Sequence, residues 1–194
     1  MSIDGGNQRK PRLSRETWTR AAFDSFTCEG IAEISIEKLA KELGATRGSF
    51  YWHFKDRSDL IDAVLRQWQR ITLNVMRDLE CISDPKERLA ALLSASFEDE
   101  AWVKRELDLL SNASDPQIHQ IVQAHTQERL AFIQDCLVQV GRKPSLALEQ
   151  AAQSWALWVG ASTLVSTMPA IISGRTPKEK LLALTRPVLA DMLE

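Results

Sequence analysis

The side chains whose types and spacing could do chemistry are concentrated in residues 46–57, TRGSFYWHFKDR. This stretch opens with small and hydrogen-bonding residues, among which Arg47 can bind the two acceptor atoms of a guanine edge at once. Gly48 has no side chain, so a partner could approach the backbone closely there. The aromatic pair Tyr51 and Trp52 follows. Adjacent residues on a helix point about 100° apart, so we expect at least one of these two rings to be exposed.

The elements that must position these side chains are two short helices on either side of a glycine turn. Ser35 is a candidate N-cap, and apolar residues recur after it at helical spacing until Gly44 ends the helix. Thr46 can cap the next helix, which we expect to run to about Phe54, with Phe50 and Phe54 facing the core. Two short helices across such a turn predict a helix-turn-helix.

Residues 35–60, SIEKLAKELGATRGSFYWHFKDRSDL, resemble the DNA-binding signature of the TetR/AcrR family of bacterial transcription regulators. By this resemblance Tyr51 reaches bases or backbone, and the polar residues around it hold phosphates. Arg57 stands where the family usually has Lys, and it is expected to add a phosphate contact near a helix N-terminus. The predicted DNA-binding residues are Thr46, Arg47, Gly48, Ser49, Tyr51, Trp52, His53, Lys55 and Arg57.

The rest of the chain has the composition and periodicity of helices. Only 8 glycines and 7 prolines interrupt 194 residues, and no alternating β pattern appears. We predict an all-α protein of about nine helices. A flexible basic arm is expected over residues 1–12, a three-helix DNA-binding domain over 13–57, and a larger helical effector-binding and dimerisation domain over 58–194. Pro187 is expected to kink the last helix or shift its start.

The larger domain would, by the same resemblance, bind a small-molecule effector and form a homodimer. The dimer would use the eighth helix, for which Ser145 is the predicted cap, and the ninth, which follows Pro177. Pocket residues can be chosen only by polarity and size. The candidates are Trp102, Leu107, Leu110, His119, His125, Trp155, Trp158 and Met168. No metal site is expected, because six positions separate the two histidines, roughly 240° around a helix.

Charge and composition exclude several classes of protein. The formal charge is −2, although residues 1–70 hold 12 of the 24 basic and only 10 of the 26 acidic side chains, which concentrates positive charge in the N-terminal part. Three cysteines without short spacing argue against a disulfide framework. An apolar leader, a run of about 18 apolar residues and the phosphate-loop, zinc-protease and nucleophile-elbow motifs are all missing from the sequence.

We therefore expect a cytoplasmic regulator, without enzymatic activity or cofactor, that represses transcription. It would bind a palindromic DNA operator as a homodimer and be released by its effector. The alternative is a helical ligand carrier or interaction protein whose DNA-binding head is degenerate, which the net negative charge favours. The sequence leaves open the effector, the operator, the regulated genes and whether ligand releases or promotes DNA binding.

Overall fold

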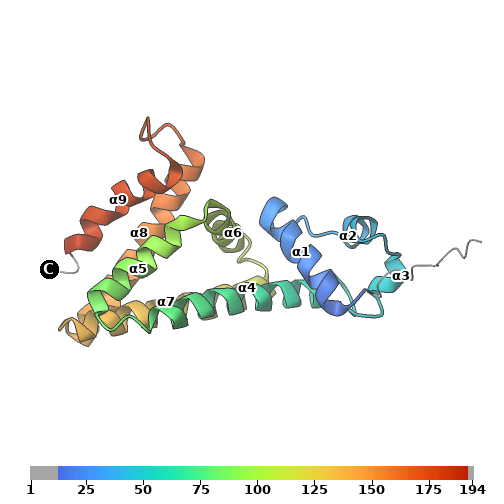
Figure 1. The fold of residues 1–194 in the computed structure, drawn as a ribbon, viewed down its shortest axis with the longest axis horizontal. Helices are drawn as coiled ribbons and strands as arrows, with labels where there is room; N and C mark the ends of the chain where they lie inside the picture. Colours follow the sequence, from blue (N-terminus) through green and yellow to red (C-terminus); the bar gives the residue numbers. More distant parts are fainter. Residues whose placement is uncertain (1–12, 192–194) are drawn as a thin grey trace, which may run out of the picture.

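The computed structural model describes residues 13–191, and over these residues the regular structure is helical throughout, as predicted (Figure 1). The basic arm expected over residues 1–12 lies outside the described residues. Nine helices occupy the described part of the chain. They are α1 (Arg15–Glu29), α2 (Ile36–Glu42), α3 (Arg47–Phe50), α4 (Arg57–Leu79), α5 (Pro85–Glu98), α6 (Glu100–Ser111), α7 (Pro116–Gln139), α8 (Pro144–Thr167) and α9 (Pro177–Asp191).

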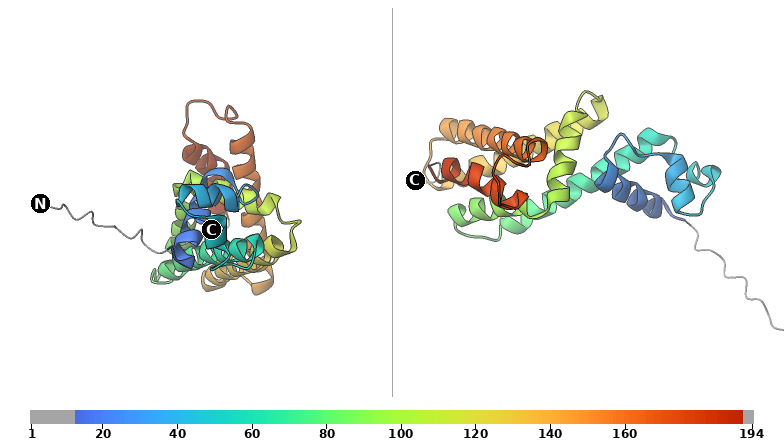
Figure 2. Two further views of the ribbon diagram at one scale, coloured as in Figure 1. Left: turned by 90° about the vertical axis from the view of Figure 1, so that its right-hand side faces the viewer. Right: turned by 90° about the horizontal axis from the view of Figure 1, so that it is seen from above.

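The helices form an elongated molecule with a small head of α1–α3 at one end and α8 and α9 at the other (Figures 1 and 2). Helix α4 begins in the head and runs into the larger domain, where it packs along α7. Its buried apolar side chains between Leu60 and Trp68 belong to the same core as those of the head. The head is therefore built on a helix that also belongs to the second domain.

Capping residues position the helices of the head, among them the predicted cap Thr46. The Ser14 side chain accepts from the Thr17 amide at the start of α1, and the Thr46 hydroxyl accepts from the Ser49 amide at the start of α3, 3.2 Å away. Gly30 ends α1 with φ at +102°, where a Cβ would come to 3.0 Å from the Asp108 carboxylate. Glycine is required here by both backbone and space.

An aromatic core fixes the segment that contains α3 and the turn after it. Phe50 is fully buried, its ring meeting Trp18 edge-on at 5.4 Å and stacking on Phe54 at 5.2 Å. The prediction that α3 extends to Phe54 is wrong, because the helix ends at Phe50. A turn over residues 51–53 follows, and the Lys55 amide bonds the Asp59 carboxylate at the start of α4 instead of a helical carbonyl.

Two details of the C-terminal helices also differ from expectation. Helix α8 begins at Pro144, one residue before the predicted cap Ser145, and its N-cap Lys143 makes no side-chain capping bond. Proline suits the first position of a helix, since its missing N–H has no helical partner there. Helix α9 starts directly at Pro177 and continues through Pro187. Among the described helices, none is long and apolar enough to cross a membrane.

Candidate functional sites

The start of α3 and the N-terminus of α1 border one surface groove of about 870 Å³. Both members of the aromatic pair are exposed, Trp52 by 86% and Tyr51 by 50%. Phe50, the last residue of α3, is buried. The lining residues are Leu13, Ser14, Arg15, Thr46, Gly48, Ser49, Trp52 and His53. Five of the nine predicted DNA-binding residues thus lie on one groove, which also includes the start of α1.

Arg47 is exposed at the start of α3 but is paired within the head. Its Nη1 lies 3.1 Å from the Glu37 carboxylate of α2, and both side chains are more than 60% exposed. A side-chain hydrogen bond to Tyr51 and the charge of Glu37 raise the pKa of the Arg47 guanidinium. The pKa of Glu37 is lowered, first by its backbone hydrogen bond, then by Ser35 and Arg47. A carboxylate thus lies beside the predicted base-reading cation.

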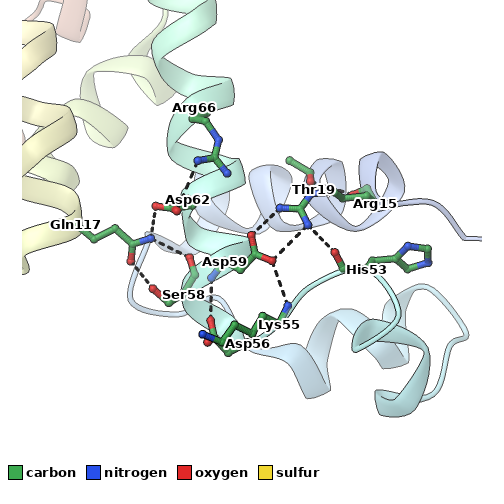
Figure 3. A network of polar contacts seen from close by, with 10 residues as sticks. All are labelled: Arg15, Thr19, His53, Lys55, Asp56, Ser58, Asp59, Asp62, Arg66 and Gln117. Carbon is green, nitrogen blue, oxygen red and sulfur yellow. Dashed lines mark hydrogen bonds and ion pairs between the residues drawn. The ribbon is translucent and has the colours of Figure 1, made fainter.

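The turn after α3 is fixed by a polar network that joins α1 to α4 (Figure 3). Arg15 donates to the His53 carbonyl at 2.5 Å, pairs with the Asp59 carboxylate at 2.7 Å, and lies over the Phe54 ring at 4.1 Å. The same carboxylate accepts from the Lys55 amide at 3.1 Å. The hydrogen bond from Arg15 is the main cause that lowers the Asp59 pKa. The predicted phosphate-binding positions His53 and Lys55 are therefore held in place by Arg15 and Asp59.

Arg57 supports the loop between α1 and α2. Its Nε donates to the Ile34 carbonyl at 2.8 Å, and its Nη2 donates to the carbonyls of Ile31 and Ala32. The Ile31 amide of this loop donates in turn to the Asp108 carboxylate of α6, 2.7 Å away. The sequence predicted a phosphate contact for Arg57 and gave no sign of this structural role, since its partners lie more than 20 residues earlier.

The predicted effector residues separate into two groups. His119 and Met168 are exposed, and Leu110 is half-buried. The other five are buried or half-buried on α6, α7 and α8. Trp155 and Trp158 stack at 5.0 Å with Leu107 packed against them, while Trp102 and His125 both contact the Trp68 ring of α4.

A buried charged cluster lies between these aromatic pairs. It consists of Glu106 from α6 with His125 and Arg129 from α7, all less than 10% exposed. A Glu106 oxygen lies 3.5 Å from His125 Nδ1 and 3.4 Å from Arg129 Nη2. The guanidinium lies 4.6 Å from the centroid of the Trp155 ring. Sequence reasoning missed Glu106 and Arg129. Arg129 could have been noticed, because it occupies a buried position in α7 four residues before Ile133.

Burial dominates the electrostatics of this cluster. It lowers the pKa of His125 to about 3, with a further contribution from the Arg129 charge, so the imidazole is neutral at pH 7. Burial also raises the pKa of Glu106, against the opposing effect of Arg129. The two shifts have the same cause, which is that the charged form of each group loses its hydration.

Comparison with known proteins agrees with this arrangement. Residues 19–64 match the family model described as bacterial regulatory proteins, tetR family. The regulator AcrR of Shigella flexneri is 40% identical over 68 residues, which are 35% of this chain and 30% of that protein. The regulator YerO of Bacillus subtilis is 29% identical over 96 residues, 48% of this chain and 32% of that protein. Both relatives are helix-turn-helix transcriptional regulators. The chain spans about a third of the length of each.

A solved structure extends the likeness to the whole fold. A transcriptional regulator from Saccharomonospora viridis, in complex with choline, superposes with a TM-score of 0.77 at 19% identity. The superposition covers 90% of this chain and 95% of that one. At this identity the likeness concerns the fold, and it includes the larger helical domain that the family model does not match. These relatives and this neighbour are transcriptional regulators and not enzymes.

Proposed function

The chain belongs to the TetR family of bacterial regulatory proteins, and on that premise we propose that it is a cytoplasmic, ligand-responsive repressor that binds a pseudo-palindromic DNA operator as a homodimer. The observation that carries the proposal is the start of α3. Hydrogen-bonding side chains there and the Trp52 ring from the following turn line a groove, and Tyr51 is also exposed, while Phe50 and Phe54 anchor the same segment to the core. Such a helix start is suited to the major groove.

The exposed residues divide by chemistry into two roles. Arg47 reads a guanine edge, with Thr46 and Tyr51 beside it, and Gly48 admits the close approach of DNA. Ser49, Trp52, His53 and Lys55 hold phosphates and fix the position of the helix, a contact that carries little sequence information. Arg57 first supports the loop between α1 and α2, whose carbonyls accept its hydrogen bonds. Through this loop it helps to position α2.

The homodimer forms through α8 and α9. Large apolar side chains that are 40–54% exposed lie along α8 and just after it, where an isolated chain would leave them in water. They are Leu146, Leu148, Leu164, Met168 and Ile171. A second copy covers this surface, and the two α3 helices then lie about one duplex turn apart, roughly 34 Å. The two-fold symmetry of such a dimer requires a pseudo-palindromic operator, and this spacing sets the separation of its half-sites.

Helix α6 and helix α4 connect the buried cluster to the head. Glu106 belongs to the cluster, and Asp108, two residues later, holds the Ile31 amide in the loop before α2. Trp68 of α4 contacts His125 at 4.5 Å between ring centroids. An effector that prefers one arrangement of this cluster shifts α6 and α4 together and changes the spacing of the heads. The S. viridis neighbour, with its choline, supports small-molecule binding by this fold.

A binding selection from fragmented genomic DNA at about 150 mM salt tests the proposal, because that salt concentration suppresses weak electrostatic association. Enrichment of a pseudo-palindrome is the expected result. Failure to enrich any sequence would favour the alternative, a ligand carrier with a degenerate head.

Two variants then test the division of roles within the enriched site. Arg47→Ala should relax base preference at one position of each half-site, by about 5- to 150-fold in relative affinity. Lys55→Ala should weaken binding to all sequences alike and lower the salt dependence by about one phosphate contact. Equal losses on every sequence for Arg47→Ala would remove this residue from base reading. Competition binding with single-base operator variants measures both effects.

A further inference from the structure

The buried cluster in the larger domain already contains an organic cation, the side chain of Arg129. Its guanidinium lies 4.6 Å from the Trp155 centroid and 5.5 Å from the Trp158 centroid, and its Nη2 lies 3.4 Å from the Glu106 carboxylate. Aromatic faces together with a carboxylate are the surroundings that attract a planar cation most strongly away from water. The cluster is therefore a cation site that the protein's own side chain occupies.

The contacts inside this site are poorly satisfied. Both polar contacts of Glu106, to Arg129 and to His125, are 3.4–3.5 Å long, whereas charge-assisted hydrogen bonds are usually about 2.7–2.9 Å. Several buried atoms of the cluster and its walls make no hydrogen bond. They are Glu106 Oε1, His125 Nε2, Arg129 Nε, Trp68 Nε1 and Trp158 Nε1. Buried polar atoms without partners are costly, so a molecule that satisfies them would bind favourably.

The two charged partners differ in how easily they can leave. Glu106 is 2% exposed, has a short side chain and is fixed in the middle of α6. Arg129 has a long flexible stem and can withdraw its charged end toward water while the stem stays buried. The charge that remains when a ligand enters is therefore the negative charge of Glu106, between aromatic walls.

We propose that the effector is a planar organic cation, of the amidinium or guanidinium type, that replaces the Arg129 guanidinium between Trp155 and Glu106. This inference rests on the proposed function, since it names the chemical class of the effector. An anion of the same shape is disfavoured, because Glu106 stays in place and repels it. A neutral amide leaves the buried carboxylate without a counter-charge.

Three aromatic probes of one shape test the charge preference with the full-length protein: benzamidine is cationic, benzamide neutral and benzoate anionic. Calorimetric titration of each probe measures Kd, and quenching of tryptophan fluorescence reports contact with the aromatic walls. Benzamidine should bind at least about tenfold more tightly than either analogue. The proposal is overturned if benzamide or benzoate binds as tightly, or if benzamidine does not bind.

Matched variants locate the site. Glu106→Gln keeps the side-chain shape and should weaken benzamidine by about tenfold or more, whereas Glu100→Gln, at the exposed Glu100–Lys104 pair of the same helix, should leave the Kd unchanged. Arg129→Met removes the internal competitor, so benzamidine should bind it more tightly and raise its Tm more than that of the wild type. Equal Kd values for wild type and Glu106→Gln would place the ligand elsewhere. If Glu106→Gln does not fold, the Arg129→Met variant and the three probes still test the proposed cation site.

A DNA readout separates this inference from the proposed function. Operator binding is measured with and without benzamidine, using the sequence from the genomic selection. Benzamidine should weaken or strengthen operator binding measurably, as expected of ligand-linked states. If the protein binds its operator but does not bind benzamidine, the proposal of a cationic effector is overturned and the DNA-binding function stands. Benzamidine binding to a protein that selects no operator would support the cation site and contradict the repressor.

Discussion

Two charged networks of this protein, one in the head and one in the larger domain, are built in opposite ways. In the head, Arg15 and Asp59 pair at 2.7 Å at the surface, and the surrounding backbone groups complete the bonding of both (Figure 3). In the larger domain, Glu106 and Arg129 are both buried, 3.4 Å apart, with hydrogen-bonding atoms left unpartnered. The first network is complete without a ligand, whereas the second is not.

The difference reflects what each region has to do. The head must present α3 in one fixed position, so its polar contacts are short and support the turn that carries His53 and Lys55. The larger domain must be able to adopt more than one arrangement if a ligand is to act through it. Unsatisfied polar groups at the contact of α6, α7 and α8 reduce the stability of the free arrangement and leave a second one within reach.

The largest test of this contrast compares two arginines. Arg129→Met leaves Glu106 buried without its counter-charge and should lower the free energy of unfolding by about 3–5 kcal/mol. Arg15→Met breaks a pair at the surface, where such pairs contribute about 0.2–1 kcal/mol. Urea unfolding followed by circular dichroism measures both.

A double variant provides the control for this comparison. Glu106→Leu combined with Arg129→Met removes both buried charges and should recover most of the stability lost by Arg129→Met alone. Similar losses for Arg129→Met and Arg15→Met would show that the buried pair is hydrated and that the contrast between the two networks is wrong.

The pH dependence of stability probes the buried cluster through His125. Burial holds the pKa of folded His125 at about 3, whereas an unfolded chain takes up this proton near the ordinary histidine pKa of 6.5. The unfolded state therefore binds more protons between these values, and stability falls as the pH falls. From pH 7 to pH 5 this loss should be about 2 kcal/mol.

The control for the pH experiment is His125→Phe, which keeps a ring against Trp68 and removes the titration. Burial raises the pKa of Glu106, so the folded state gains stability from that group as the pH falls, opposite in sign to His125. Both proteins contain Glu106, and the difference between their unfolding curves isolates the histidine. Parallel curves at pH 7 and pH 5 would show that folded His125 titrates normally.

The contrast between the two networks also explains how far the sequence could predict the structure. The helix starts at Ser35 and Thr46 depend on neighbouring residues, and both predictions are confirmed. The end of α3 was predicted four residues too late, and the turn that follows it is held by a tertiary contact, from Arg15 to the His53 carbonyl 38 residues away. Contacts between distant residues escaped prediction for the same reason.

Arg57 and Arg129 illustrate this limit. A sequence pattern identifies an arginine as a candidate for binding phosphate or for exposure to water. It does not show that Arg57 donates to carbonyls 23–26 residues away, or that Arg129 is buried beside a carboxylate of another helix, 23 residues away in the sequence. The charge of an arginine can be read from the sequence, but the groups that satisfy it are set by the packing of the helices.

Gly48→Ala is a smaller change in the head, at the start of α3. A Cβ added there would meet only the Thr46 hydroxyl, at an ordinary 3.8 Å, so Gly48→Ala should fold with stability unchanged or raised by at most about 1 kcal/mol. In the DNA complex the methyl group would occupy space that the proposed backbone approach requires, and operator affinity should fall about tenfold. Normal operator affinity for Gly48→Ala would mean that DNA does not approach the backbone there.

The smallest expected effect concerns the Glu37–Arg47 pair, which would compete with DNA in the proposed complex. Glu37 lies 3.1 Å from Arg47, and both side chains are exposed, so their attraction is weak and screened by salt. Glu37→Gln removes a negative charge from the DNA-facing side and frees Arg47, which should raise operator affinity by up to about fivefold at low salt. Glu33→Gln, at the exposed contact of Glu33 with Lys38 in the same region, is the control for net charge alone. If both variants raise affinity equally, general repulsion of phosphates accounts for the gain; only a larger effect of Glu37→Gln, lost in the Arg47→Ala background, assigns Glu37 a specific hold on the base-reading side chain.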